Sequence, residues 1–258
     1  MNLAFNQSVA QRYSSNSQKS RVLTETWLGE NMYCPVCGCP VLKHYVANKP
    51  VADFCCEKCG SDFELKGYES GEKSFRKIIA DGAYPTMVKR ITSLNNPNLF
   101  VMTYFNQSVN SLILIPKFFF LPEVIIKRKP LSNNARRAGW VECNINIGEI
   151  PNDAKINVVV NGYVVPQCDV IERYRRIQHL QTSTLQKRGW IIDVMKCVDN
   201  IAKEEFSLKD VYAFEEELRK KHPENNFIKE KLRQQLQVLR DGGFIEFASR
   251  GHYRKIKI

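Results

Sequence analysis

The chain has 258 residues and a net charge of +11, so it is long enough for two ordinary domains and basic enough to favour a polyanionic partner such as DNA. A hydrophobic content of 43% with 25% charged residues is typical of a soluble globular protein, and no apolar run approaches the roughly twenty residues that cross a bilayer. The nine cysteines are an odd number, which argues against a secreted disulfide scaffold and favours a reducing compartment and metal-bound thiolates. Residues Met1–Ser20 contain polar Asn, Gln and Ser where a signal peptide would need an apolar centre, so we expect a cytoplasmic protein with no membrane partner.

The first predicted element is a helix, and a four-cysteine metal site follows it. Residues Ser17–Trp27 place apolar side chains at helical spacing. The pairs Cys34/Cys37 and Cys56/Cys59 each enclose two residues, and eighteen residues separate the pairs, which is a spacing typical of a zinc ribbon. Because four thiolates close the coordination shell of Zn²⁺, we predict a structural zinc ion and not a catalytic one.

Five further cysteines lie outside these two pairs. Cys55 is a possible rival of Cys56 as a zinc ligand, but choosing it would spoil the two-residue spacing. We expect all five to be small buried hydrophobic residues. They are Cys39, Cys55, Cys143, Cys168 and Cys197.

Two carboxylates and a lysine overlap the second cysteine pair. Asp53 lies in a short apolar segment, and the alternation of a strand sends Glu64 and Lys66 to one face while Leu65 points into the core. Carboxylates on adjacent strands can hold Mg²⁺, with the Leu65 carbonyl as a further ligand, and the ammonium of Lys66 can orient or help deprotonate an attacking water. These are the requirements for cutting a phosphodiester.

Taken alone, this pattern of acids and lysine is weakly specific. Its simplest alternative is a surface ion pair between Glu64 and Lys66. The apolar neighbours Phe54 and Phe63, the enclosed cysteine pair and the basic charge of the chain favour a nuclease site instead.

The middle of the chain predicts a helix over Phe75–Leu94, in which Gly82 and Pro85 are weak points. Two core strands, Leu99–Phe105 and Ser111–Ile115, flank a turn, and a hairpin follows over Val158–Val165. Residues 122–139 are rich in Lys, Arg, Pro and Asn, which favours a loop facing DNA. We place a domain boundary near Thr182, giving an N-terminal domain of residues 1–182 and a C-terminal domain of residues 183–258.

The C-terminal domain predicts three helices and a basic hairpin, the elements of a winged helix. The helices are expected over Trp190–Ile201, Leu208–Lys220 and Asn226–Asp241, and Ser207 with Asp210 has the spacing of a capping box. From Lys229 to the end there are eight Lys plus Arg against three Asp plus Glu, which indicates a nucleic-acid surface.

The spacing of apolar residues separates a buried face of the third helix from a solvent face. Ile228, Leu232, Leu236 and Leu239 recur at helical intervals and form the buried stripe. The outward side chains then include Arg233, Gln234 and Gln237, which can read guanine or adenine by paired hydrogen bonds. In the following hairpin, the side chains expected at the tip to contact phosphate or the minor groove are Arg250, His252, Tyr253 and Arg254.

The sequence resembles the methyl-directed restriction endonucleases of the DpnI type, a branch of the PD-(D/E)xK nucleases. Matching blocks occur in one order along nearly the whole chain. They are SNSQKSRVLTETW, CPVCG, PVADF, FELK, DGAYPTMVKR, RKPL, ARRAGW and KEKLRQQLQVLRD. The wider nuclease pattern often has proline where this chain has Ala52, a position that does no chemistry.

The resemblance implies an α/β fold with a mixed sheet flanked by helices, a zinc insertion at about residues 34–59 and a C-terminal winged helix. It implies Mg²⁺-dependent cleavage of double-stranded GATC that carries N6-methyladenine. By position, Asp53 and Glu64 would bind Mg²⁺, Lys66 would be the catalytic lysine, and the paired cysteines would hold zinc. Trp140 matches an aromatic residue near the methylated adenine, and Arg136 and Arg137 precede it, although a buried core tryptophan is an equal alternative.

Two other functions remain open from the residues themselves. One is a zinc-ribbon and winged-helix regulator that binds DNA without cutting it, and the other is a repair nuclease selective for branched DNA. For the enzyme we expect a monomer that needs Mg²⁺ and Zn²⁺ but no organic cofactor.

Overall fold

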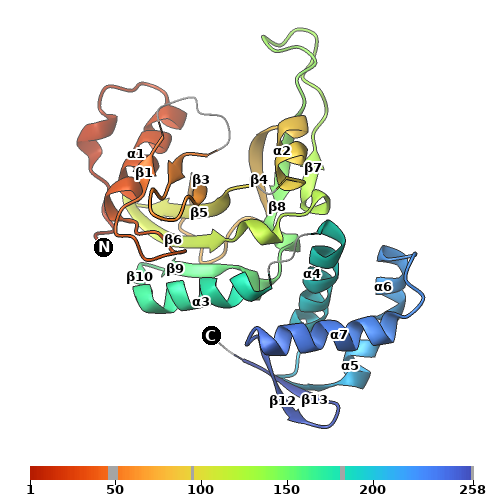
Figure 1. Cartoon of the computed structure of the whole chain (residues 1–258). Coiled ribbons are helices and arrows are strands. Elements are labelled where there is room, and N and C mark those ends of the chain that lie inside the picture. Colours follow the sequence, from red (N-terminus) through yellow and green to blue (C-terminus); the bar gives the residue numbers. More distant parts are fainter. Residues whose placement is uncertain (46–51, 94–95, 181–183, 257–258) are drawn as a thin grey trace. The chain divides into compact units, whose positions relative to one another are not determined.

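The structure is a computed structural model that describes residues 1–45, 52–93, 96–180 and 184–256. Their contacts divide the chain into two compact units (Figure 1). The N-terminal unit comprises Met1–Glu149 and Lys155–Tyr174, and the C-terminal unit comprises Ile150–Ala154 and Arg175–Ile258. Helix α3 (Gln167–His179) contains the point of division. None of the helices in the described ranges is both long and apolar enough to span a membrane.

The N-terminal unit is built on a seven-stranded mixed sheet. Its strand order is β1-β2-β3-β5-β6-β9-β10, with β3 and β5 parallel and the other neighbours antiparallel. The strands are β1 (Lys43–His44), β2 (Phe54–Cys55), β3 (Asp62–Glu69), β5 (Asn98–Phe105), β6 (Ser108–Ile115), β9 (Ile156–Val160) and β10 (Tyr163–Val164). The predicted core strands and the later hairpin are therefore confirmed.

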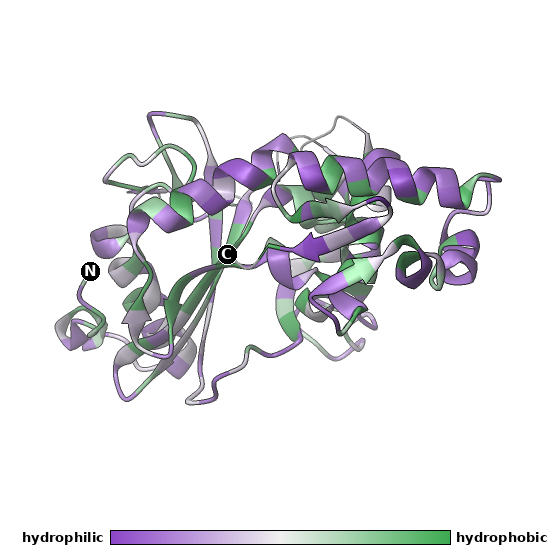
Figure 2. Cartoon of the chain, turned by 90° about the horizontal axis from the view of Figure 1, so that it is seen from below, coloured by the Kyte–Doolittle hydropathy of each residue, from purple (hydrophilic) through white to green (hydrophobic). Residues whose placement is uncertain are grey.

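The centre of this sheet is buried because its strands are apolar on both faces. In β6 the run Leu112–Ile115 is at most 2% exposed, and Phe100 of β5 stacks on Phe63 of β3 at a centroid distance of 5.4 Å. The predicted N-terminal helix is present as α1 (Asn16–Asn31). Figure 2 shows that the helices are mostly hydrophilic ribbons interrupted by short hydrophobic stretches, as expected where one side of a helix is buried.

A second, three-stranded sheet has the order β4-β8-β7, and it corrects one prediction. Its strands are β4 (Ile78–Ala83), β7 (Ile125–Lys127) and β8 (Glu142–Asn146). The predicted single helix over Phe75–Leu94 is wrong, because β4 occupies part of its first half and, among the described residues of this range, only α2 (Tyr84–Ile91) is helical. Pro85 lies in the first turn of α2, where proline fits because no backbone donor is needed.

The C-terminal unit contains the elements of a winged helix. The helices are α4 (Leu185–Asn200), α5 (Leu208–Tyr212), α6 (Glu215–Lys221) and α7 (Ile228–Asp241), and the strands are β11 (Glu205–Ser207), β12 (Ile245–Ser249) and β13 (His252–Lys255). The predicted capping box at Ser207 and Asp210 is present, but the helix that it opens breaks after Tyr212 and resumes as α6. The apolar stripe of α7 is buried as predicted.

Short 3-10 helices connect several of these elements. They are η1 (Gln7–Ala10), η2 (Lys117–Phe119), η3 (Pro122–Val124), η4 (Ile147–Glu149) and η5 (Asn152–Ala154). The predicted fold class, a mixed α/β sheet with flanking helices followed by a winged helix, is confirmed.

Candidate active site and zinc centre

Asp53 lies directly before β2 and is fixed to β3 by two hydrogen bonds. The backbone N–H of Asp53 donates to the Phe63 carbonyl at 2.9 Å, and the N–H of Leu65 donates to Asp53 Oδ2 at 2.8 Å. One carboxylate oxygen is thus tied to the strand that carries Glu64 and Lys66. The predicted alternation holds in β3, since Phe63 and Leu65 are buried.

Glu64 and Lys66 meet on one face of β3, as their spacing predicts. Lys66 Nζ lies 2.8 Å from Glu64 Oε1 and 2.7 Å from Asp81 Oδ1. The Asp81 side chain is only 7% exposed and comes from β4 in the other sheet. The pairing of Glu64 with Lys66 is therefore one side of a buried cluster, and the surface ion pair is excluded.

Sequence reasoning missed both Asp81 and Arg90 in this cluster. Arg90, on α2, has Nη1 at 4.0 Å from Glu64 Oε2, and its side chain is 12% exposed. Both residues belong to the block DGAYPTMVKR, whose only functional signal in the sequence is its place in the family resemblance. Its apolar pattern suggested a helix, and nothing in that pattern indicated that Asp81 would face β3.

Burial and charge pairing shift the pKa values of three groups in the cluster. Burial raises the pKa of Asp53 and of Glu64 above their usual values, although Leu65 N–H opposes the shift at Asp53 and Lys66 opposes it at Glu64. Burial alone would lower the pKa of Lys66, but the carboxylates of Glu64 and Asp81 outweigh it and hold that pKa above its ordinary value. Lys66 is therefore an ammonium at neutral pH, and it can donate hydrogen bonds to an anion.

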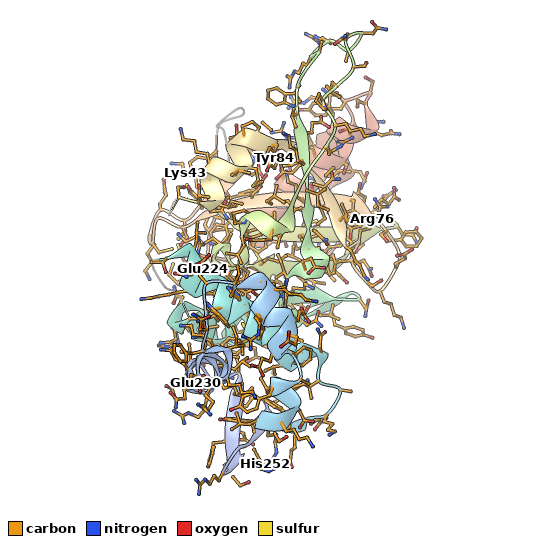
Figure 3. All side chains as sticks on the ribbon, turned by 90° about the vertical axis from the view of Figure 1, so that its right-hand side faces the viewer. Lys43, Arg76, Tyr84, Glu224, Glu230 and His252 are labelled. Atoms are coloured by element: carbon orange, nitrogen blue, oxygen red, sulfur yellow. The ribbon has the colours of Figure 1, made fainter. Side chains whose placement is uncertain are left out.

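A cleft of about 470 Å³ opens beside Lys66. Its walls come from α1, β3 and β4, together with Arg76 from the segment before β4. The guanidinium of Arg76 lies over the Tyr68 ring at 4.6 Å, and the Tyr68 hydroxyl accepts a hydrogen bond from Arg76 N–H at 2.8 Å. Figure 3 labels Arg76 at the outer edge of the N-terminal unit. The cleft therefore joins the buried cluster to a basic side chain at the surface.

Four cysteine sulfurs converge at the predicted zinc centre. The ligand atoms of Cys34, Cys37, Cys56 and Cys59 all lie within 4.8 Å of one another. Sulfur separations of 3.7 Å for Cys34–Cys59 and 3.5 Å for Cys37–Cys56 suit thiolates that share one tetrahedral ion. Four thiolates suit zinc, and together they would fill a tetrahedral coordination shell and leave no position for a water ligand.

The two cysteine turns have the same backbone design. In the first, Cys34 N–H donates to the Cys39 carbonyl and Gly38 N–H donates to the Cys34 carbonyl, at 2.7 and 2.8 Å. In the second, Cys56 donates to Ser61 and Gly60 donates to Cys56, at 2.9 and 2.8 Å. Gly38 and Gly60 have φ of 73° and 70°, a conformation that glycine adopts without strain.

The second cysteine turn is also the turn of the hairpin that carries the acids. Cys56 follows β2 directly, and the turn closes through the Ser61 carbonyl immediately before β3. Desolvation opposes ionisation of Cys59, but hydrogen bonds from Ser61 prevail and lower its pKa to about 7, which favours the thiolate that a metal needs. Metal binding and the position of Asp53 are therefore linked through one short hairpin.

The remaining cysteines only partly follow the expectation of burial. Cys143 and Cys197 are buried, Cys39 and Cys55 are intermediate, and Cys168 is exposed. The expectation is therefore wrong for Cys168, which lies exposed in the first turn of α3.

Residues between β7 and β8 form an arm that extends away from the sheet (Figure 1). Leu131 N–H donates to the Trp140 carbonyl and Gly139 N–H donates to the Leu131 carbonyl, at 2.9 and 3.1 Å, so the arm closes on itself. Trp140 is 38% exposed, and the Arg137 guanidinium lies 5.4 Å from its ring centre. The alternative of a buried core tryptophan is excluded.

The predicted base-reading residues lie on the solvent face of α7. Arg233, Gln234 and Gln237 are exposed. The Arg233 guanidinium is held by the Tyr212 hydroxyl at 3.2 Å and by Glu230 at 3.1 Å. Because these contacts are exposed to solvent and weak, the Arg233 guanidinium can leave them at a small cost in free energy.

The hairpin β12–β13 confirms the exposure of Arg250 and His252 but corrects two other placements. Figure 3 shows His252 at the outer end of this hairpin. Tyr253 is not at the tip, because it is 9% exposed and packs between Phe206 and Phe247. Arg254 lies on β13, where its guanidinium binds Glu205 and Glu246 at 2.6 and 2.8 Å.

Fold and site together define a class of protein: an α/β domain with a buried carboxylate–lysine cluster and a four-cysteine cluster that fits zinc, followed by a winged helix. The family described as DpnI, Dam-replacing family, matches residues 1–183. A second family model, described as the Dam-replacing HTH domain, matches residues 186–255 of the same chain. The chain belongs to the DpnI family, and the resemblance noted in its sequence is confirmed. This membership supports a restriction endonuclease that binds DNA.

Proposed function

We propose that the protein is a Mg²⁺-dependent endonuclease that cuts double-stranded DNA at GATC containing N6-methyladenine. The observation that carries the proposal is the hydrogen bond that ties Asp53 to β3 beside the paired Glu64 and Lys66, with Lys66 lining the cleft, in a chain of the DpnI family. The methyl and GATC specificity rests on the family alone. We further propose that the protein is a cytoplasmic monomer. We place the boundary between its nuclease and winged-helix domains near residue 182, which lies outside the described residues.

The residues of the cluster have complementary roles in this proposal. Asp53 and Glu64 would hold Mg²⁺, with the Leu65 carbonyl as a third oxygen, because Mg²⁺ takes one or two carboxylates and keeps several waters. The ion supplies charge neutralisation on the attacked phosphate and a more acidic water. Leu65 N–H keeps Asp53 in place, and the Lys66 ammonium donates hydrogen bonds to the phosphate or to the attacking water.

The exposed basic and aromatic residues supply DNA binding. Arg136, Arg137 and Trp140 lie on the arm, where the indole can pack against a base or its methyl group. In the winged helix, Arg233, Gln234 and Gln237 face solvent on α7, and Arg250 and His252 lie near the hairpin tip. Tyr253 and Arg254, given their packing and ion pairs, contribute to the stability of this hairpin in our proposal.

The test is digestion of matched plasmids that carry methylated or unmethylated GATC, with Mg²⁺ or with EDTA. We expect wild-type protein to cut only the methylated plasmid and only with Mg²⁺. Asp53→Asn should lower the rate at least about 100-fold while DNA binding with Ca²⁺ is retained. Glu69→Gln is the matched control, because it removes one carboxylate from an exposed position at the end of the same strand, β3.

The two other functions predict different results in the same assay. Binding of methylated DNA without cutting would favour a regulator, and cutting of branched DNA alone would favour a repair nuclease. Undiminished cutting by Asp53→Asn would refute the assigned site.

A further inference from the structure

Asp81 contributes to the cluster from a separate sheet, and its two carboxylate oxygens differ in the hydrogen bonds that they accept. Oδ1 accepts hydrogen bonds from Lys66 Nζ and from Gly82 N–H, both at 2.7 Å. Oδ2 is also buried, but it accepts no hydrogen bond from the described residues. A buried oxygen without a donor is unfavourable, and such atoms in folded proteins call for an explanation.

The local backbone of β4 turns this carboxylate toward Lys66. The pairing of β4 with β8 shifts register between Asp81 and Ala83, so β4 carries a bulge at this point. A bulge re-aims the side chain next to it and is common beside active sites. Gly82 lies within the bulge, where its N–H fixes the Asp81 carboxylate. The strand therefore departs from regular pairing at the residue that contacts the lysine.

Lys66 has two anionic partners, and a metal ion would compete for one of them. In the structure its ammonium lies 2.8 Å from Glu64 and 2.7 Å from Asp81. A divalent cation at Glu64 would withdraw that carboxylate from the lysine and repel the ammonium. Asp81 is then the anion that keeps the ammonium beside the cleft, and its free Oδ2 offers a second acceptor.

We propose that Asp81 is a positioning residue, which holds the Lys66 ammonium in place for cleavage while Glu64 binds the metal. This inference rests on the proposed nuclease function. It differs from a purely structural role, because a structural ion pair would affect folding and DNA binding but would not act through Lys66. It also differs from metal ligation, since Asp81 does not need to contact the ion.

The test compares Asp81→Asn with wild type in single-turnover cleavage of methylated duplex. The amide keeps the size of the side chain but removes its charge. We expect the cleavage rate at saturating Mg²⁺ to fall about 10- to 100-fold, as for other residues that orient a catalytic group. The DNA dissociation constant with Ca²⁺ should stay within about twofold of wild type, and the control Glu69→Gln should leave both quantities unchanged.

A double-mutant cycle with Lys66 gives the decisive readout. In a Lys66→Ala background, assayed at high protein concentration, Asp81→Asn should slow the residual cleavage less than about twofold, since its target is already absent. An equal slowing in both backgrounds would overturn the positioning role, and so would a wild-type rate for Asp81→Asn.

A second variant covers the case in which Asp81→Asn folds poorly. Asp81→Glu keeps the charge but displaces it by one methylene, so positioning predicts slow cleavage with normal DNA binding. A wild-type rate for Asp81→Glu would overturn the proposal. Failure of the wild-type protein itself to cut methylated DNA would overturn both this inference and the nuclease function. Cutting by the wild type together with an unchanged rate for Asp81→Asn would overturn this inference alone.

Discussion

The contact between Gly67 and Thr24 gives a prediction whose size follows from the structure. Gly67 lies on β3 next to Lys66, and a Cβ added there would be 2.8 Å from Thr24 Cγ2 and 3.3 Å from Thr24 Cβ. Thr24 on α1 is 3% exposed, and its hydroxyl donates to the Ser20 and Arg21 carbonyls at 2.9 and 3.1 Å. The threonine therefore cannot turn aside easily, and Gly67→Ala must move α1 away from β3.

The expected cost of Gly67→Ala is about 2 kcal/mol of unfolding free energy, the middle of the range for adding a methyl group to a filled core. For a unit of this size, this corresponds to a fall of about 4–8 °C in the melting temperature. Because Gly67 and Thr24 both line the cleft, we also expect slower cleavage. The unfolding free energy can be measured in urea from the fluorescence of Trp27, which is 2% exposed on α1.

Two further variants separate the clash from a general effect of alanine. Gly29→Ala is the matched control on α1, because its Cβ would lie 3.5 Å from the Phe54 ring, an ordinary contact, and alanine favours helix by about 1 kcal/mol. Thr24→Ala removes Cγ2, so it should restore at least about 1 kcal/mol to the Gly67→Ala protein. Wild-type stability of Gly67→Ala, or no restoration by Thr24→Ala, would refute the reasoning.

Three other predictions follow from the zinc centre, the cleft and the C-terminal unit. Cys56→Ser should lose the bound zinc, measured with a chromogenic chelator, together with folding and cutting, whereas Cys55→Ser should keep all three because its sulfur lies outside the cluster. Arg76→Ala should weaken DNA binding and reduce the slope of log affinity against log salt by about 1; an unchanged slope would show that Arg76 contacts no phosphate. Burial opposes ionisation of the Asp193 carboxyl, but its hydrogen bonds with His222 and Lys221 outweigh burial and lower its pKa. The stabilisation of the fold by this carboxylate is therefore fully present above about pH 4, the pKa of an aspartate in an unfolded chain, and is lost as pH falls through the lowered pKa. Asp193→Asn should therefore cost about 2–3 kcal/mol at pH 7 in urea unfolding, and this difference should shrink below about pH 4.

Much of the fold could be predicted because local patterns and burial agree. The runs that form β5 and β6 are apolar at nearly every position, which fits strands covered on both faces. The turn between them has positive φ at Asn106 and Gln107, of 47° and 62°. The stripe of α7 and the capping box of α5 were equally local signals.

The errors lie where contacts distant in sequence decide the structure. Residues 78–83 have no strand pattern strong enough to outweigh the helical spacing around them, and they become β4 by pairing with β8, more than fifty residues further along the chain. Asp81 was missed for the same reason. In the hairpin β12–β13, the count of basic residues indicated a binding surface, but only cross-strand neighbours could show that Arg254 is paired with Glu205 and Glu246.

Two of the predicted zinc ligands lie between Asp53 and Glu64 in the sequence, and the short length of β2 gives a physical reason for this arrangement. This strand has only two residues, Phe54–Cys55, and a hairpin with so short an arm is marginally stable by itself. The carboxylate of Asp53 must nevertheless keep its place relative to β3, where Leu65 N–H holds one of its oxygens. In the proposed protein, a metal held by Cys56 and Cys59 would close the turn and tie it to the first cysteine pair, so it would stabilise the hairpin from its far end. Such a metal would fix the position of the Asp53 carboxylate of the proposed active site without taking part in the proposed chemistry.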